Sequence, residues 1–134
     1  MPHCVILYTP NIESKTDVGA LCRRLADTML TIRDEAGKQV FPTGGTRVLA
    51  YPAAHYAVAD GKGDYAFVYI NVRMGAGRSD AVKKNAGDRL MAKVQAHFAP
   101  TFEKEPIGIT LQIDESPGQV YDGKHSSLHP LFNK

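Results

Sequence analysis

The order of elements in this chain repeats, and that repeat limits the possible folds more than any other feature. A strand, a polar turn, an amphipathic helix and a second strand are predicted over about 2–53 and again over about 64–115. The second unit starts roughly 62 residues after the first, which indicates an internal repeat of one supersecondary unit. Each predicted helix has a single apolar face, so both should lie on the same side of one sheet. We therefore expect an α+β fold, with two βαβ units forming a four-stranded mixed sheet with two helices on one face.

Hydrophobic spacing gives approximate bounds for the first unit. Residues 3–9 form a nearly continuous apolar run, typical of a strand buried on both faces. Ser14 is the predicted N-cap of the helix that follows, and Gly37 is its predicted C-terminal stop. Residues 47–51 form the predicted second strand.

The second unit begins with the clearest strand of the chain, over 65–74, in which aliphatic residues alternate with aromatic and polar ones. Ser79 is the predicted N-cap of the second helix, and the prolines of 100–106 should end that helix. Residues 107–114 alternate as a half-buried last strand. Residues 116–134 are rich in glycine and proline and should form an extended tail.

The predicted sheet has one face that the helices do not cover. In strand 65–74 this face carries Tyr65, Phe67 and Tyr69. Two layers from a single chain leave these aromatic side chains bare, so we expect the chain to associate with itself.

Composition limits the class of protein. The chain has 134 residues, which is most consistent with one domain over 1–134, and its 16 basic and 14 acidic residues give a net charge of +2. So small a charge does not indicate a nucleic-acid partner. No apolar stretch approaches the roughly 18 residues of a membrane span, so we expect no membrane partner and a cytoplasmic location. Both cysteines, Cys4 and Cys22, occupy apolar positions and are predicted to be small core residues.

Several kinds of site are only weakly supported. The turn Gly75-Ala76-Gly77-Arg78 lies between a strand and a helix, but Asp80 occupies the last position of a dinucleotide-binding pattern and would repel pyrophosphate. The turn can still hold a carboxylate or a phosphate. The five histidines form no convincing metal-binding pattern, so we expect no metal site.

Pro2 admits two interpretations. Proline has no amide hydrogen, so it is tolerated as the first residue of a strand. If Met1 is removed, however, Pro2 carries a free secondary amine. Burial and nearby cations lower the pKa of an amine, and a general base needs a pKa close to neutral. Arg47 and Arg78 are both predicted at the ends of elements, where they could supply that charge and also bind a carboxylate bidentately.

With these residues assembled, the chain resembles the 5-carboxymethyl-2-hydroxymuconate isomerases, a family of the tautomerase superfamily. The resemblance covers nearly the whole chain and rests on Met1-Pro2-His3, Phe41-Pro42, Gly45-Thr46-Arg47, Ala59-Asp60-Gly61, Asp64-Tyr65-Ala66-Phe67-Val68 and Gly75-Ala76-Gly77-Arg78-Ser79. Segment 33–39 looks longer than in enterobacterial members, and the tail after Ser116 shares little with them.

The resemblance implies a homotrimer whose sheets face inward. It implies a cofactor-independent intramolecular oxidoreductase, with neither a metal nor an organic cofactor, that converts the dienol 5-carboxymethyl-2-hydroxymuconate to its keto isomer in homoprotocatechuate (4-hydroxyphenylacetate) degradation. Pro2 would be the catalytic base. Arg47 and Arg78 would be catalytic and, with Gly77, would bind a dicarboxylate or tricarboxylate dienol substrate.

Three alternatives remain open from the sequence. The same base could act on another 2-hydroxydienoate or on the enol of an arylpyruvate. The fold could belong to a non-enzymatic binding protein, as the resemblance to macrophage migration inhibitory factor permits. The Gly75–Ser79 turn alone could serve a small-anion sensor, which would tolerate Pro2→Ala. Two arginines suit a substrate with more than one carboxylate and favour the first activity.

Overall fold

The computed structural model describes residues 3–132. Its strands are β1 (His3–Tyr8), β2 (Val48–Pro52), β3 (Ala66–Gly75) and β4 (Ile107–Ser116), and its helices are α1 (Val18–Thr31) and α2 (Asp80–Lys104). Short 3₁₀ turns are η1 (Pro10–Ile12), η2 (Thr43–Gly45) and η3 (His129–Leu131). The predicted succession of two strand–helix–strand units is confirmed.

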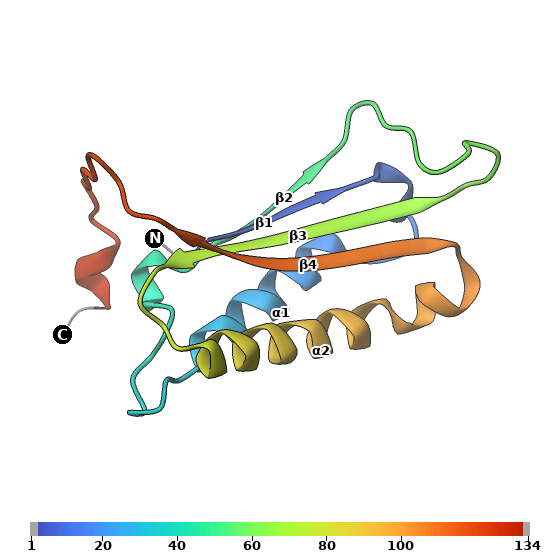
Figure 1. Cartoon of the computed structure of the whole chain (residues 1–134). Coiled ribbons are helices and arrows are strands. Elements are labelled where there is room, and N and C mark those ends of the chain that lie inside the picture. Colours follow the sequence, from blue (N-terminus) through green and yellow to red (C-terminus); the bar gives the residue numbers. More distant parts are fainter. Residues whose placement is uncertain (1–2, 133–134) are drawn as a thin grey trace.

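The four strands form one mixed sheet in the order β2-β1-β3-β4. β1 pairs with β2 in parallel and with β3 antiparallel, and β3 pairs with β4 in parallel. Figure 1 shows both helices beneath the same face of this sheet. The predicted two-layer α+β architecture is therefore confirmed.

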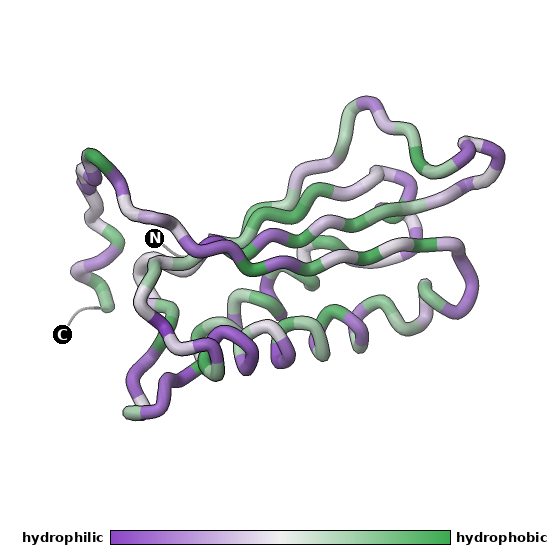
Figure 2. The backbone as a smooth tube through the Cα atoms, in the orientation of Figure 1, coloured by the Kyte–Doolittle hydropathy of each residue, from purple (hydrophilic) through white to green (hydrophobic). Residues whose placement is uncertain are grey.

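One apolar layer between the sheet and the helices forms the core. Alternate residues of β3 point into this layer because side chains of a strand alternate between its two faces. Those residues are all buried, as are the inward-facing positions of both helices: Ala66, Val68, Ile70, Val72 and Met74 in β3, Leu21, Leu25 and Met29 in α1, and Val82, Leu90, Val94 and Phe98 in α2. Figure 2 shows the same alternation of apolar and polar positions along the strands.

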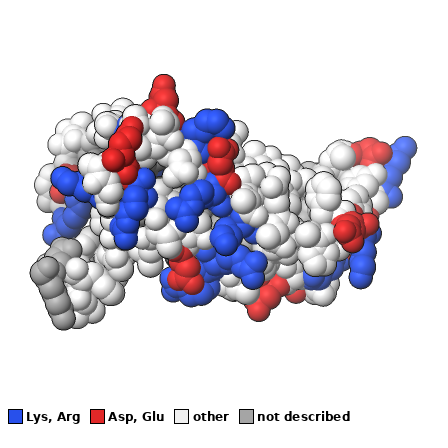
Figure 3. Space-filling view, turned by 90° about the horizontal axis from the view of Figure 1, so that it is seen from below, with Lys and Arg blue, Asp and Glu red and all other residues white. Residues whose placement is uncertain are grey.

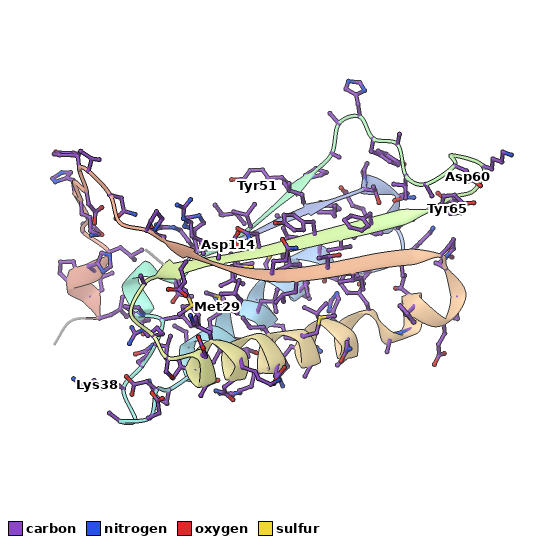
Figure 4. All side chains as sticks on the ribbon, in the orientation of Figure 1. Met29, Lys38, Tyr51, Asp60, Tyr65 and Asp114 are labelled. Carbon is purple, nitrogen blue, oxygen red and sulfur yellow. The ribbon has the colours of Figure 1, made fainter. Side chains whose placement is uncertain are left out.

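The opposite face of the sheet is open in the single chain. Leu7 of β1 is 47% exposed, and Tyr51 and Phe67 on the neighbouring strands are also exposed. Tyr51 projects from β2 on the side away from the helices (Figure 4). The prediction that the first strand is buried on both faces is therefore wrong for the isolated chain, because both helices cover the same face.

Helix α1 begins later and ends earlier than predicted. Asp17, and not Ser14, is its N-cap, with its side chain accepting the Ala20 N–H at 2.9 Å. A further turn follows η1 and extends past Ser14, because the N–H groups of residues 15 and 16 both donate to the Ile12 carbonyl. Helix α1 ends at Thr31, so Gly37 lies in a separate turn after it, with a φ of 80°.

Helix α2 begins as predicted but continues through Pro100. The Ser79 side chain caps it by accepting the Val82 N–H. Proline inside a helix removes one hydrogen bond and costs about 3 kcal/mol or more. The helix continues to Lys104 because Phe98 and Thr101, on either side of the proline, remain buried. The burial of these neighbouring side chains therefore offsets the cost of proline within the helix.

The outer faces of the helices carry mixed charge. Figure 3 views the molecule from the helix side and shows lysines and arginines interspersed with acidic side chains. Examples are the ion pairs between Arg23 and Asp27 and between Lys84 and Asp88, one helical turn apart. Within residues 3–132, no helix is both long enough and apolar enough to cross a membrane.

Candidate functional site

Strand directions bring the predicted site residues to one end of the sheet. β1 and β2 are parallel, so both start at this end, whereas β3 runs antiparallel to β1 and finishes there. His3, the first residue of β1, lies opposite Arg73 near the end of β3. Arg47 precedes β2 and Arg78 follows β3, so both belong to this end (Figure 1). Pro2 lies outside the described residues, and it is bonded to His3.

Arg47 is attached to the beginning of β1 through its backbone. Its carbonyl accepts the Cys4 N–H at 2.9 Å. The Arg47 side chain is exposed, and within residues 3–132 it takes part in no hydrogen bond or ion pair. A guanidinium without internal partners can present all of its N–H groups to a ligand.

Arg47 lines a cavity of about 620 Å³ beside α1. Residues of α1, η2 and β2 form part of its wall, and the tail supplies the rest: Cys22, Arg23, Ala26, Leu30, Thr43, Thr46, Val48, Leu128 and Phe132. This wall is mainly apolar but includes Arg23 and Arg47. An apolar wall with positively charged side chains suits an organic anion.

The tail reaches this cavity because it packs closely on η2. A Cβ on Gly44 would lie 2.8 Å from Nδ1 and 3.0 Å from Cα of His129. Only glycine allows this approach without displacing η3. The close packing places Leu128 and Phe132, on either side of η3, against the cavity. No local pattern in the sequence signals this contact, since 85 residues separate Gly44 from His129.

Arg78 lies in the turn between β3 and α2 and is half-buried, with 35% of its side chain exposed. Its Nη2 donates to the Val40 carbonyl at 3.2 Å, and its Nη1 lies 3.7 Å from Oδ2 of Asp34. Both partners belong to the segment between α1 and β2. The sequence gives no signal for these partners, because Asp34 falls within the predicted end of the first helix, between Ser14 and Gly37.

Gly77 gives the Arg78 turn its shape. Its φ of 106° lies in the left-handed region that favours glycine, and no atom lies within 4 Å of a Cβ built there. Gly77 and Arg78 line a second hollow of about 270 Å³, together with residues 40, 42 and 74–76. The role of Gly77 in binding substrate stays a prediction.

The structure brings the two arginines to the same end of the sheet but not into one cavity. The hollows that contain Arg47 and Arg78 share no lining residue. The segment from Val40 to Thr46 contributes to both of them, so it separates the two hollows within one chain.

The cysteines confirm the prediction that both are core residues. Cys4 is buried, and Cys22 packs against the core without being fully covered. Burial, together with the nearby Cys22, raises the pKa of the Cys4 thiol from 9.0 to about 12, and burial also raises the pKa of Cys22. Raised pKa values keep both thiols protonated near neutrality, which makes them poor nucleophiles. Residues 3–132 contain no cluster of three or more histidine, cysteine or acidic side chains that could hold a metal ion.

Comparisons with known proteins agree over almost the full chain. A family model described as 5-carboxymethyl-2-hydroxymuconate isomerase matches residues 2–132. The chain is 29% identical over 132 residues to the 5-carboxymethyl-2-hydroxymuconate Delta-isomerase of Escherichia coli, covering 98% of this chain and 99% of that protein.

Solved structures with the same name are also similar. The crystal structure of a 5-carboxymethyl-2-hydroxymuconate delta-isomerase matches with a TM-score of 0.95 and 53% identity, covering 100% of this chain and 94% of that chain. That of a 5-carboxymethyl-2-hydroxymuconate isomerase from Deinococcus radiodurans matches with a TM-score of 0.85 and 33% identity, covering 99% and 95%. At 14% identity and a TM-score of 0.54, a macrophage migration inhibitory factor-like protein from Entamoeba histolytica shares the fold alone.

Proposed function

The chain belongs to the 5-carboxymethyl-2-hydroxymuconate isomerase family, and from this we propose that it converts the dienol 5-carboxymethyl-2-hydroxymuconate to its keto isomer in homoprotocatechuate breakdown. Members of the family are enzymes by name. The observation that carries the proposal is the meeting of the first residue of β1 with the Arg47 and Arg78 segments at one end of the sheet.

In this proposal Pro2 is the general base once Met1 has been removed. Its nitrogen takes a proton from the 2-hydroxyl group of the dienol and returns a proton to a carbon atom, so that the enzyme is regenerated unchanged. Arg47 and Arg78 bind carboxylates and stabilise the negative charge that spreads over the dienolate. The same positive charges favour the neutral form of a nearby amine and lower its pKa, which makes it an effective base near neutral pH.

The two arginines support a substrate with at least two carboxylates. Among residues 3–132 the Arg47 side chain has no hydrogen-bond or ion-pair partner, and it faces a mainly apolar cavity, whereas Arg78 lines a separate hollow at the same end. A dienol that carries carboxylates at separate positions can engage both guanidinium groups. An arylpyruvate has only one carboxylate and would leave one of the arginines unused.

We also propose that the chain assembles as a homotrimer through the open face of its sheet. This face exposes Leu7, Leu49, Tyr51 and Phe67 side by side on paired strands. Burial of such side chains is worth about 1.5–3 kcal/mol for each one that becomes fully covered. Sedimentation equilibrium should give three times the mass of the chain, and a monomer at micromolar concentration would contradict the assembly.

The test of the activity is ketonisation followed by ultraviolet absorbance, using protein whose mass shows that Met1 is absent. We expect turnover of 5-carboxymethyl-2-hydroxymuconate with a kcat/KM at least 100-fold above that for the enol of phenylpyruvate. Comparable or better turnover of the phenylpyruvate enol would overturn the assigned substrate. No turnover of either compound by correctly processed protein would overturn the proposed activity.

A further inference from the structure

The segment between α1 and β2 contacts the Arg78 turn at three points. Nη2 of Arg78 donates to the Val40 carbonyl at 3.2 Å, and Nη1 lies 3.7 Å from Oδ2 of Asp34. The neighbouring Ser79 hydroxyl donates to Oε2 of Glu35 at 2.7 Å. Residues 32–40, here called the Asp34 loop, therefore hold the turn that carries Arg78.

Asp34 is itself fixed by the loop. Its Oδ1 accepts the backbone N–H groups of Ala36 and Lys38, each at 2.9 Å, and only 17% of its side chain is exposed. Gly37 allows the tight turn with its φ of 80°. One carboxylate oxygen of Asp34 thus shapes the loop, and the other faces Arg78. Lys38 points outward from the loop, away from the sheet (Figure 4).

The base of the Asp34 loop is anchored in the core. Ile32 and Val40 are buried, and the Val40 N–H donates to the Ile32 carbonyl at 3.0 Å. A bridge between Arg33 and Gln39 continues this pairing toward the tip. The two groups that face Arg78 therefore come from a segment with little freedom to move.

We propose that Asp34 is a positioning residue, which together with the Val40 carbonyl holds the guanidinium of Arg78 in one orientation for a substrate carboxylate. The inference rests on the proposed function, in which Arg78 binds substrate. A guanidinium has five N–H donors, and the contacts with Asp34 and Val40 leave the others available. Holding a binding group in its working geometry before substrate arrives removes an ordering cost from binding.

The test is Asp34→Asn, measured as separate effects on KM and kcat. Asparagine keeps an Oδ1 that can accept the Ala36 and Lys38 N–H groups, so the loop keeps its turn. We expect KM to rise about tenfold with kcat within about twofold, because the guanidinium must now be ordered by the substrate. The matched control is Glu35→Gln, which makes the same charge change one residue away beside Ser79, and which should leave KM within about twofold.

The same substitution in an Arg78→Ala background separates positioning from a general effect on the loop. If Asp34 acts through Arg78, Asp34→Asn has no further effect once Arg78 is gone. An equal rise in KM with and without Arg78 would overturn the inference. An unchanged or lowered KM in the single variant would also overturn it, since a lowered KM would mean that Asp34 competes with the substrate.

A second measurement does not depend on the activity. Phenylglyoxal modifies arginine, and the modification of the peptide that contains Arg78 can be timed by mass spectrometry of the intact folded protein after digestion. We expect Asp34→Asn to speed this modification at least threefold and Glu35→Gln to leave it unchanged. If the wild type does not convert the dienol, the proposed function fails while this rate still tests the inference. Equal rates in wild type and Asp34→Asn would overturn it.

Discussion

The two βαβ units each bring one arginine to the same end of the sheet, but they hold these arginines differently. Arg47 precedes β2 of the first unit and is exposed, with no side-chain partner among the residues that the structure describes. Arg78 follows β3 of the second unit and contacts Val40 and Asp34, both in the first unit. Folding therefore orients one arginine in advance and leaves the other to be oriented by a ligand or by a neighbouring chain.

A repeated unit can therefore contribute two unlike halves to one site. Both helices cap at their first turn and face the same core, yet α1 has 14 residues and α2 has 25. In the first unit, the connection that follows the shorter helix α1 folds back on itself as the Asp34 loop. The second unit has the short Gly75–Ser79 turn at the corresponding end, and the loop of the first unit packs on it.

The largest expected effect tests whether the two units share one core. Leu25 in α1 and Leu90 in α2 are both about 1% exposed. Leu25→Ala and Leu90→Ala should each lower the free energy of unfolding by about 2–5 kcal/mol, through lost burial and a cavity. Urea denaturation followed by circular dichroism and by tyrosine fluorescence should show a single coincident transition in both variants. Two transitions, only one of which moves, would mean that the units unfold separately.

The next effect sharpens the contrast between the two arginines. Lysine keeps the charge but lacks the planar fork of a guanidinium, so it should replace a pre-oriented arginine poorly. We expect Arg78→Lys to lower kcat/KM for the dienol by about 100-fold and Arg47→Lys by about tenfold. Steady-state ketonisation measures both variants. Equal losses would show that the contacts of Arg78 with Asp34 and Val40 have no bearing on its role.

A smaller effect concerns the buried thiol of the first unit. The pKa of Cys4 is raised to about 12, so the folded state holds this proton more tightly than the unfolded state does. The resulting stabilisation is complete below about pH 9 and is lost as the pH rises towards 12. At pH 10 this thiol alone should lower the free energy of unfolding by about 1.4 kcal/mol relative to its value at pH 8, because the thiol ionises in the unfolded state but not in the folded one.

Cys4→Ala isolates this contribution from the other groups that titrate in the same range. The pKa of Lys15 and that of Lys83 are also raised, chiefly by hydrogen bonds to Asp64 and Glu115, so both change stability in the same direction. Denaturation at pH 8 and at pH 10 gives the drop in the free energy of unfolding between the two pH values. This drop should be smaller for Cys4→Ala than for wild type. Equal losses would contradict the assignment to Cys4.

The smallest expected effects are at the two helix caps. Asp17 caps α1 and Ser79 caps α2, each by accepting a backbone N–H of the first turn. Replacing either with alanine should lower the free energy of unfolding by about 1 kcal/mol. Ser79→Ala also removes the hydrogen bond to Glu35. Modification of Arg78 by phenylglyoxal should therefore be faster in Ser79→Ala and unchanged in Asp17→Ala.

Much of the fold could be predicted because its signals are local. Alternation along β3 and the single apolar face of each helix determine which side chains enter the core, and both predictions are confirmed. The N-cap of α1 was misassigned because Ser14 and Asp17 are both good caps, and the preceding 3₁₀ turn decides between them. The sequence predicts a helix end at Pro100, but α2 continues past it to Lys104. The burial of Phe98 and Thr101 that keeps this turn helical depends on the whole fold and not on the local sequence.

The candidate site was predictable only in part. Arg47 and Arg78 could be expected at one end of the sheet, because they flank strands that run in opposite directions. Their partners could not, since 38 residues separate Val40 from Arg78 and 44 separate Glu35 from Ser79. Contacts of this kind depend on how a loop folds back after its helix has ended, and neither spacing nor composition reports that.

The central proposal is that a free amine on Pro2 is the base. Two preparations of the same chain test it most directly, one with Met1 removed and one with Met1 retained, as verified by mass. Pro2 of the first carries a basic nitrogen, whereas the nitrogen of the second belongs to an amide. The account predicts that ketonisation of 5-carboxymethyl-2-hydroxymuconate is at least about 1000-fold slower with Met1 retained. Equal rates in the two preparations would contradict it.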